Sequence, residues 1–417
     1  MGRRLSGWWM AVSLMLLVCA PSGQAAAQEA PTLSAVLASA MARNPDILTA
    51  RLALDSADAE RRIARALPNP TITASPNSPY QYLASLPADL GPARWYRTRA
   101  SGAGRDAARR DVADVIRRVR FAVRQGFYDL LLADERRGVA SEQRDIFAQM
   151  LAADSVRLAS GDIPPRNVTK SLLELTRAEA ALAAASARVR QARLALQNLM
   201  GVSHPDTGFQ VSGRLDFTSL DFARDSLIAT ARSGRPDLAA ARERARQSRA
   251  LNSLATSALL PAPIITLAWQ PDGAFVPATF WTLGRGRQLS LGVGFTLPLF
   301  SWYGGERQRA RAGVEAADLA VTRTETMVET EVASAWDGFD VARALARRYQ
   351  SGLLDDAARS LADARYAYGS GALSQLDLLD AIRTYSEVRD DAASALHDYW
   401  VSAAALESAT GSEELSE

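Results

Sequence analysis

Apolar and small residues recur at helical spacing along most of the chain, and two segments show this most clearly. The segment 175–199 holds a coiled-coil seam with spacings of three and four, formed by Leu175, Ala178, Leu182, Ala185, Val189, Ala192, Leu196 and Leu199. The segment from about 105 to 160, interrupted only by Gly126 and Gly138, would form a helix roughly 80 Å long. Globular helices seldom run so long, whereas coiled coils do. An ordinary amphipathic bundle would explain the apolar stripe but not this length.

One stretch follows a different period. From 289 to 299 the odd residues are all apolar, which predicts a strand with one apolar face; they are Leu289, Leu291, Val293, Phe295, Leu297 and Leu299. Four strands are expected, two in each half of the chain, at 71–84, 94–101, 264–270 and 287–300. In the second of these, Trp95, Arg97 and Arg99 share one side, whose basic groups would face water in a lumen.

The strands suit an outer membrane. Strands of about 9–11 residues cross such a membrane when alternate apolar side chains face the lipid. Four strands cannot close a barrel, and lipid excludes an open sheet edge because its backbone groups would lack partners. The strands are therefore expected to close with copies from other chains. A small soluble β-patch is the alternative interpretation.

The two halves of the chain resemble each other. Gly161 and Gly371 are 210 residues apart, as are Gly201 and Gly411. Each half reads as a helix, two strands, a long helix, a tight glycine turn and a second long helix. The chain is therefore predicted to be an internal duplication. The expected units are a signal peptide at 1–27, a first repeat at 28–201, a linker at 202–224, a second repeat at 225–411 and a tail at 412–417.

The first residues of the chain read as an export signal. Two arginines precede a short apolar run and an Ala-x-Ala site, so cleavage is expected before Gln28. Cys19, the only cysteine, lies in this segment, so no disulfide is expected in the mature chain. Cys19 is also a weak candidate for lipidation, since the residue before it is not small.

Composition and charge mainly exclude classes of function. The net charge is +2, and basic patches with interleaved aromatic residues are missing, which argues against nucleic-acid binding. The two histidines, His204 and His397, are far apart, and the sequence holds no metal-ligand cluster, phosphate loop or nucleophile motif. The chain is expected not to be an enzyme and to need no cofactor.

Near the C-terminus the sequence YGSGALSQLDLLDA places Asp377 and Asp380 after Tyr368 and Gly371. This motif resembles the pattern of TolC-like outer-membrane efflux factors, which include drug exporters and a heavy-metal-efflux branch. Two tandem repeats of that pattern span essentially the whole mature chain. The stretch FTLPLFSWYGGERQRA, 295–310, also resembles the strand-to-helix junction of the family. The short chain and compact strand loops favour the metal-efflux branch.

The resemblance implies a fold that is mainly α with membrane β. Three chains would form a homotrimer, each giving four strands to a 12-stranded barrel in the outer membrane, with a coiled-coil tunnel in the periplasm. The implied function is a passive conduit that exports small molecules or metal ions. Its partners would be a periplasmic adaptor protein and an inner-membrane pump of the RND or a similar type. A soluble periplasmic adaptor or structural coiled-coil protein is the alternative.

The resemblance also places the narrow end of the tunnel at the two glycine turns. Gly161 and Gly371, together with Ile163 and Leu373, would form the surface on which the adaptor docks. Leu373 stands where drug-exporting members carry a basic gating partner. The gate bond network of those members is therefore expected to be absent.

Three residues near the second turn are candidates for the pore constriction and its gating: Tyr368, Asp377 and Asp380. The two aspartates are three apart on one helix face, so threefold symmetry would make two carboxylate rings that attract cations. A solvated helix face, with an acid favoured by the helix N-terminus, is the alternative. The equivalent residues of the first half are Asn167 and Lys170, so that half lacks the acid pair.

Overall fold

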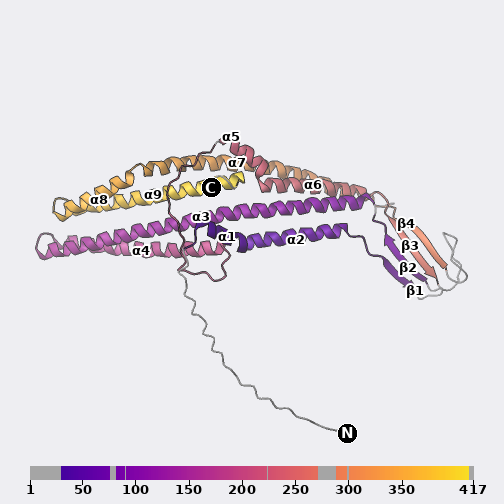
Figure 1. The fold of residues 1–417 in the computed structure, drawn as a ribbon, viewed down its shortest axis with the longest axis horizontal. Helices are drawn as coiled ribbons and strands as arrows, with labels where there is room; N and C mark the ends of the chain where they lie inside the picture. The colour runs from indigo at the N-terminus through magenta and orange to yellow at the C-terminus, as the bar shows by residue number, and fades with distance from the viewer. Residues whose placement is uncertain are drawn as a thin grey trace, which may run out of the picture.

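The helices form an elongated bundle, and a small sheet lies at one end of it (Figure 1). The computed structural model describes residues 30–75, 81–89, 91–222, 224–270, 288–297 and 300–412. The expected signal peptide, with Cys19, and most of the expected tail lie outside the described residues. None of the described helices combines the length and the apolar character that crossing a lipid bilayer requires.

The two halves of the chain contain a similar succession of elements. In the first half these are α1 (Leu33–Arg43), α2 (Pro45–Arg65), β1 (Thr71–Ser75), β2 (Gln81–Pro87), α3 (Pro92–Ala159) and α4 (Pro165–Leu199). In the second half they are α5 (Arg224–Gly234), α6 (Pro236–Ser257), β3 (Pro263–Gln270), β4 (Gln288–Phe295), α7 (Gly304–Gln350), α8 (Leu353–Gly369) and α9 (Gln375–Thr410). The second half lies along the first, with α6 and α9 packed against α3. The expected mainly helical fold with a few strands is confirmed.

Burial confirms the predicted coiled-coil seam. Ala178, Ala185, Val189 and Leu196 of the α4 seam are buried. Of their counterparts 210 residues later, those in the middle and at the end of α9 are buried as well: Ala392, Ala395, Tyr399, Leu406 and Ala409. The same packing register is therefore kept in both halves of the chain.

The four strands form one antiparallel sheet in chain order, β1-β2-β3-β4. The register brings most of the large apolar side chains to one face, as where Leu267 lies opposite both Ala84 and Leu291. This apolar face consists of Ile72, Ala74, Tyr82, Ala84, Leu86, Ile265, Leu267, Trp269, Leu289, Leu291, Val293 and Phe295. The opposite face carries mostly smaller or polar residues, among them Thr73, Ser85, Thr266, Ser290 and Gly292, together with the larger Leu83 and Ile264. The predicted one-sided strand is confirmed, and the whole sheet shares its polarity.

The strand predicted at 94–101 is wrong, because this segment belongs to the start of α3. Pro92 occupies the first turn of the helix, where its missing N–H costs nothing. Arg94 and Arg97 then lie three residues apart and donate to backbone oxygens at the end of α2, at 2.7 and 3.2 Å. Helical spacing brings both guanidinium groups to those carbonyls. The long helix consequently starts well before residue 105.

The other strand boundaries also differ from the prediction. The region predicted as a single strand, 71–84, contributes both β1 and the beginning of β2. Pro76 and Pro79 fall between these strands in the sequence, and proline cannot donate to a β-ladder. β4 ends at Phe295, several residues before the predicted end at 300.

The long helices of the two halves differ in continuity. α3 runs for 68 residues, whereas its counterpart is interrupted between α7 and α8, so a single long helix in the second half was a wrong expectation. Gly352 at the interruption has a φ of 103°, which glycine adopts without the strain that a side chain would cause. The equivalent position 210 residues earlier is Glu142, which is helical and binds Arg389.

Each repeat is closed by a similar joint. Asn44 caps α2, and its Nδ2 donates to the backbone oxygen of Leu199 at the end of α4, at 2.8 Å. Arg235 precedes α6 in the same way, and its Nη1 donates to the backbone oxygen of Ala409 at the end of α9, at 3.1 Å. Leu199 and Ala409 are themselves 210 residues apart. The hydrogen bonding of the joint, and not only the sequence, therefore repeats.

Candidate gating site at the hairpin ends

Two helical hairpins, α3–α4 and α8–α9, form the end of the bundle opposite the sheet (Figure 1). Gly161 and Gly371 at the two turns have φ values of 83° and 79°. In both turns the N–H after the glycine donates to the carbonyl five residues earlier, at 2.9 and 2.8 Å, which closes the helix end. The prediction of two matching glycine turns is confirmed.

One buried carboxylate joins the two hairpins. Asp154 of α3 has no exposed surface, and it accepts hydrogen bonds from Ser171 of α4 and from the Tyr368 hydroxyl of α8. Gln375, in the first turn of α9, donates through Nε2 to Asp154 at 3.3 Å and to Ser171 Oγ at 2.8 Å. The same amide donates to the backbone oxygen of Asn167 at 3.1 Å. Asp154 thus connects all four helices.

Tyr368 lies inside this joint. Its side chain is buried, and the Arg157 guanidinium lies 5.4 Å from the centre of its ring. Burial, and then the hydrogen bond and charge of Asp154, raise the pKa of Tyr368 far above its usual range. The hydroxyl therefore remains a hydrogen-bond donor at all physiological pH values. The structure places this gating candidate between the hairpins, where its hydroxyl bonds α8 to Asp154 of α3.

Asp377 and Asp380 lie on the exposed side of α9. Ser374 caps this helix, because its Oγ accepts from the Asp377 N–H at 3.3 Å and donates to the Asp377 carboxylate at 2.6 Å. The Asp380 side chain is 69% exposed and lies 3.4 Å from Arg383. Asp377 therefore has a structural part in the cap, and Arg383 offsets the charge of Asp380 within each chain.

The other two tip candidates, Ile163 and Leu373, are half-buried. Leu373 packs against an apolar cluster that includes Phe147, Met150 and Leu378. Leu373 therefore makes an apolar contact at the position compared above with the basic gating partner of drug-exporting members. Polar contacts between the hairpins are present nonetheless, through the network around Asp154.

Sequence reasoning misses Asp154, Ser171 and Gln375. Spacing marks two of them, because Ser171 lies four residues before Leu175 of the α4 seam and Asp154 lies four residues after the buried Met150. A polar residue at a seam position otherwise filled by apolar residues often fixes the partner and register of a coiled coil. Gln375 carries no comparable signal in the sequence.

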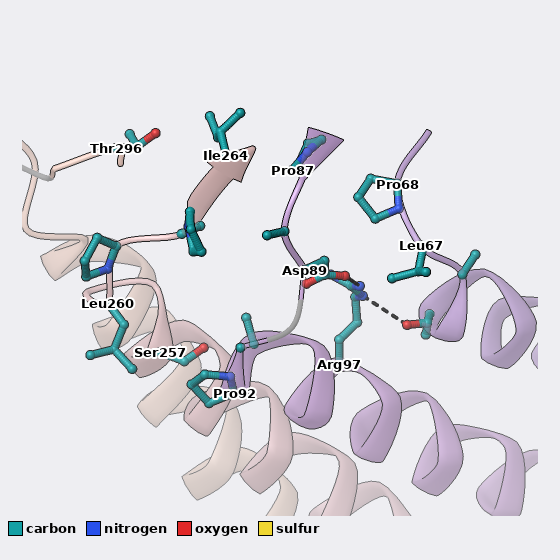
Figure 2. Close-up of a pocket in the computed structure, with 18 of the residues that line it drawn as sticks. Leu67, Pro68, Pro87, Asp89, Pro92, Arg97, Ser257, Leu260, Ile264 and Thr296 are labelled. Atoms are coloured by element: carbon teal, nitrogen blue, oxygen red, sulfur yellow. Dashed lines mark hydrogen bonds and ion pairs between the residues drawn. The ribbon is translucent and has the colours of Figure 1, made fainter. Parts of the chain in front are cut away.

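At the opposite end of the bundle, a cavity of about 610 Å³ lies where the sheet meets the helices (Figure 2). Its walls are mainly apolar and include Pro68, Pro87, Pro92, Pro261 and Pro263. Arg97 lines the cavity, binds Asp89 and donates to the backbone oxygen of Ala64 at 3.2 Å. These contacts and the fixed φ angles of the prolines set the direction in which the sheet leaves the bundle.

Comparison with known proteins identifies the family. The model of the outer membrane efflux protein family matches two segments of the chain, 36–202 and 227–412. The chain belongs to the outer membrane efflux protein family. The match is double, as expected for an internally duplicated chain. This family consists of efflux channels and is not a family of enzymes.

Individual relatives of this outer membrane efflux protein agree with the family assignment. It is 29% identical over 371 residues to the cobalt-zinc-cadmium resistance protein CzcC of Cupriavidus metallidurans, covering 86% of this chain and 84% of that protein. Its fold matches the CmeC outer membrane channel of Campylobacter jejuni with a TM-score of 0.78 at 18% identity, over 91% of this chain and 85% of that one. VceC of Vibrio cholerae gives 0.73 at 16% identity, over 91% and 96%.

These findings settle the broad function. The efflux protein is a channel component of the outer membrane with a large helical part in the periplasm. The alternative of a soluble periplasmic adaptor is set aside by the family match, which covers both repeats.

Proposed function

We propose that three copies of this efflux protein share one 12-stranded barrel and form a passive conduit through the outer membrane. The register of the sheet carries this proposal, because one chain presents a continuous apolar face and two edge strands, β1 and β4. Lipid does not tolerate unpaired strand edges. Pairing β4 of one copy with β1 of the next satisfies both edges and turns the apolar face to the lipid.

In this proposal the helices continue the barrel as a coiled-coil tunnel in the periplasm. The hairpin turns at Gly161 and Gly371, which are exposed, would meet a periplasmic adaptor protein. The adaptor would connect the tunnel to an inner-membrane pump of the RND or a similar type. The network around Asp154 would hold the hairpins together and so keep the narrow end closed until the partners bind.

Metal ions are the cargo that the comparisons favour, because the similar protein CzcC is named for resistance to cobalt, zinc and cadmium. The exposed acids of the tip, Asp377 and Asp380, would then form two rings around the mouth in a trimer. Carboxylate rings attract cations and thus select what enters a pore. Arg383 would weaken the attraction of the Asp380 ring for cations, because it pairs with Asp380.

An arginine on the apolar face of the sheet should prevent insertion into the membrane. The substitution Leu291→Arg places a charge toward the lipid, at a cost of about 2–4 kcal/mol near the middle of the bilayer. We expect less protein in the outer-membrane fraction and fewer heat-stable oligomers on unheated gels. Ser290→Arg is the matched control, because the neighbouring residue faces the other side of the sheet. Equal loss from both variants would contradict the assigned orientation of the sheet.

Neutralising the acids of the tip should weaken block by multivalent cations. The double substitution Asp377→Asn and Asp380→Asn removes exposed charges worth about 1 kcal/mol, so the blocking concentration should rise about fivefold. Single-channel recording with a trivalent cation on the periplasmic side measures this. Asp356→Asn, an exposed acid on α8 that is paired with Arg359, serves as the control. Unchanged block in the double variant would remove the carboxylate rings from the proposal.

A further inference from the structure

His397 lies midway along the contact between α3 and α9, outside both the family motif and the network around Asp154. We propose that protonation of His397 clamps α9 to α3 and that loss of the proton loosens this contact. The effect on channel opening rests on the proposed function, whereas the effect on the strength of the contact does not.

The geometry of His397 favours its charged form. Its Nε2 lies 2.8 Å from an Asp129 oxygen on α3, and its Nδ1 lies 2.9 Å from an oxygen of the adjacent Asp398. A neutral imidazole has one N–H and one lone pair, so it can donate to only one of the two carboxylates. The imidazolium donates to both. Loss of the proton therefore turns a lone pair toward one of the carboxylate oxygens.

The bond to Asp129 crosses between helices that belong to different repeats, whereas the bond to Asp398 lies within α9. The His397 side chain is only 13% exposed, so water replaces a lost partner poorly there. Beside it, the Trp400 ring stacks on Tyr128 of α3, with the ring centres 5.7 Å apart. This stacking does not depend on pH, so His397 is the titrating part of the local contact.

Several other charged groups of this contact are paired with one another. Along the same α3–α9 surface these pairs are Arg136 with Asp390, Arg389 with Glu135 and Glu142, and Arg124 with Glu407. On the other side of α9, α7 contributes Arg343, which binds Asp221 of the connecting segment and Asp340. Tyr349 of α7 interacts with Asp391. Among the described residues, Asp129 and Asp398 are the charged groups that act directly on the imidazole.

The balance of these effects sets the direction of the pH response. Burial of the His397 ring opposes its charge, but the hydrogen bonds and charges of Asp129 and Asp398 outweigh burial and raise the pKa of His397. Because the pKa of His397 is higher in the folded state, protonation stabilises the fold, and this stabilisation is complete below the pKa of the unfolded chain, near 6.5. That stabilisation is lost as the pH rises through the folded pKa. The contact should therefore weaken between mildly acidic and mildly alkaline conditions.

The consequence for the channel follows from the position of α9. This helix leads directly to Gln375 and the tip network, so a looser contact with α3 favours separation of the hairpins. The channel should therefore open more readily at mildly alkaline than at mildly acidic pH. Such a response would couple the conduit to the proton concentration of the periplasm.

The test uses the purified full-length oligomer and the fact that the chain has two histidines. Thermal unfolding is measured from about pH 6 to about pH 8.5 for the wild type, His397→Gln and His204→Gln. The wild type and His204→Gln should lose thermal stability as the pH rises. His397→Gln should lose most of this pH-dependent shift, because glutamine does not titrate. A wild-type pH dependence in His397→Gln would overturn the proposal.

A second variant covers the case in which His397→Gln fails to assemble. Asp129→Asn keeps the histidine but removes the charge that it meets on α3, and it should shrink the same pH-dependent shift. An unchanged shift in Asp129→Asn would also overturn the clamp. Conductance of the same variants is recorded separately. A pH-dependent stability without any conductance in the wild type would keep the clamp and refute the proposed conduit.

Discussion

Replacing Asp154 by alanine should separate the hairpins and raise the open probability of the channel. The substitution leaves the Tyr368 hydroxyl, Ser171 Oγ and Gln375 Nε2 without their shared acceptor inside the bundle. Only the buried Tyr368 hydroxyl is then left without an acceptor, because Ser171 Oγ and Gln375 Nε2 keep their bonds to the Asn167 backbone oxygen. Together these losses should cost about 3 kcal/mol, which is a factor of about 100 in the equilibrium between joined and separated hairpins. Single-channel recordings of the purified oligomer should show longer openings than those of the wild type.

Two further variants make this result specific. Asp154→Asn keeps one carbonyl acceptor and the shape of the side chain, so it should fall between the wild type and Asp154→Ala. Asp145→Ala removes an exposed acid from the same helix, where it lies 3.1 Å from Arg144, and should behave as the wild type. An assembled Asp154→Ala channel with wild-type openings would show that the network does not hold the narrow end closed.

Replacing Arg235 by alanine should cause the largest loss of stability in the second repeat. The Arg235 side chain is 1% exposed, and it binds Asp237 at 2.6 Å, Glu331 at 2.5 Å and the backbone oxygen of Ala409. Its removal takes a buried cation away from two partly exposed carboxylates and a donor away from the Ala409 backbone oxygen, at a cost of about 2 kcal/mol. Chemical denaturation of the assembled protein should show a clearly lower midpoint.

The pH dependence of this loss of stability follows from the pKa of Asp237. Burial opposes ionisation of Asp237, but the hydrogen bonds and charge of Arg235 outweigh it and lower the pKa of that carboxyl. The resulting stability is present above the ordinary carboxyl pKa of about 3.9 and is lost as the pH falls through the lowered value. The difference between wild type and Arg235→Ala should therefore shrink in strong acid.

A surface arginine of α5 provides the control. Arg232 pairs with Glu329, and both side chains are largely exposed, at 57% and 44%. Such pairs contribute about 0–1 kcal/mol, so Arg232→Ala should be close to the wild type. Equal losses from Arg232→Ala and Arg235→Ala would show that burial of the joint does not matter to the fold.

The regular parts of the fold could be predicted because their sequence periods are long. The α4 seam continues over eight layers, and β4 alternates cleanly, so helix and strand were assigned correctly there. The segment 94–101 alternates over only a few residues, and the proline that starts a helix at 92 was the stronger signal. In a segment this short, a helix-start signal outweighs an alternating pattern of side chains.

The candidate site could be predicted only in part. The glycine turns and Tyr368 stand out through the repeat and the motif. Asp154, however, bonds to residues 17, 214 and 221 positions away, so its role depends on how the two repeats pack. The same holds for His397, whose partner Asp129 is 268 residues distant. Contacts between repeats of this kind become visible only in the folded chain.

In the proposed assembly the sheet of one chain is part of a barrel shared by three copies. The most direct measurement is the size of the oligomer extracted from the outer-membrane fraction in mild detergent, on gels run with and without heating. A shared barrel should give a trimer that withstands mild detergent, appears only in this fraction and dissociates on heating. A monomer in the soluble periplasmic fraction would contradict it, because four strands with an apolar face would then need no partner copies.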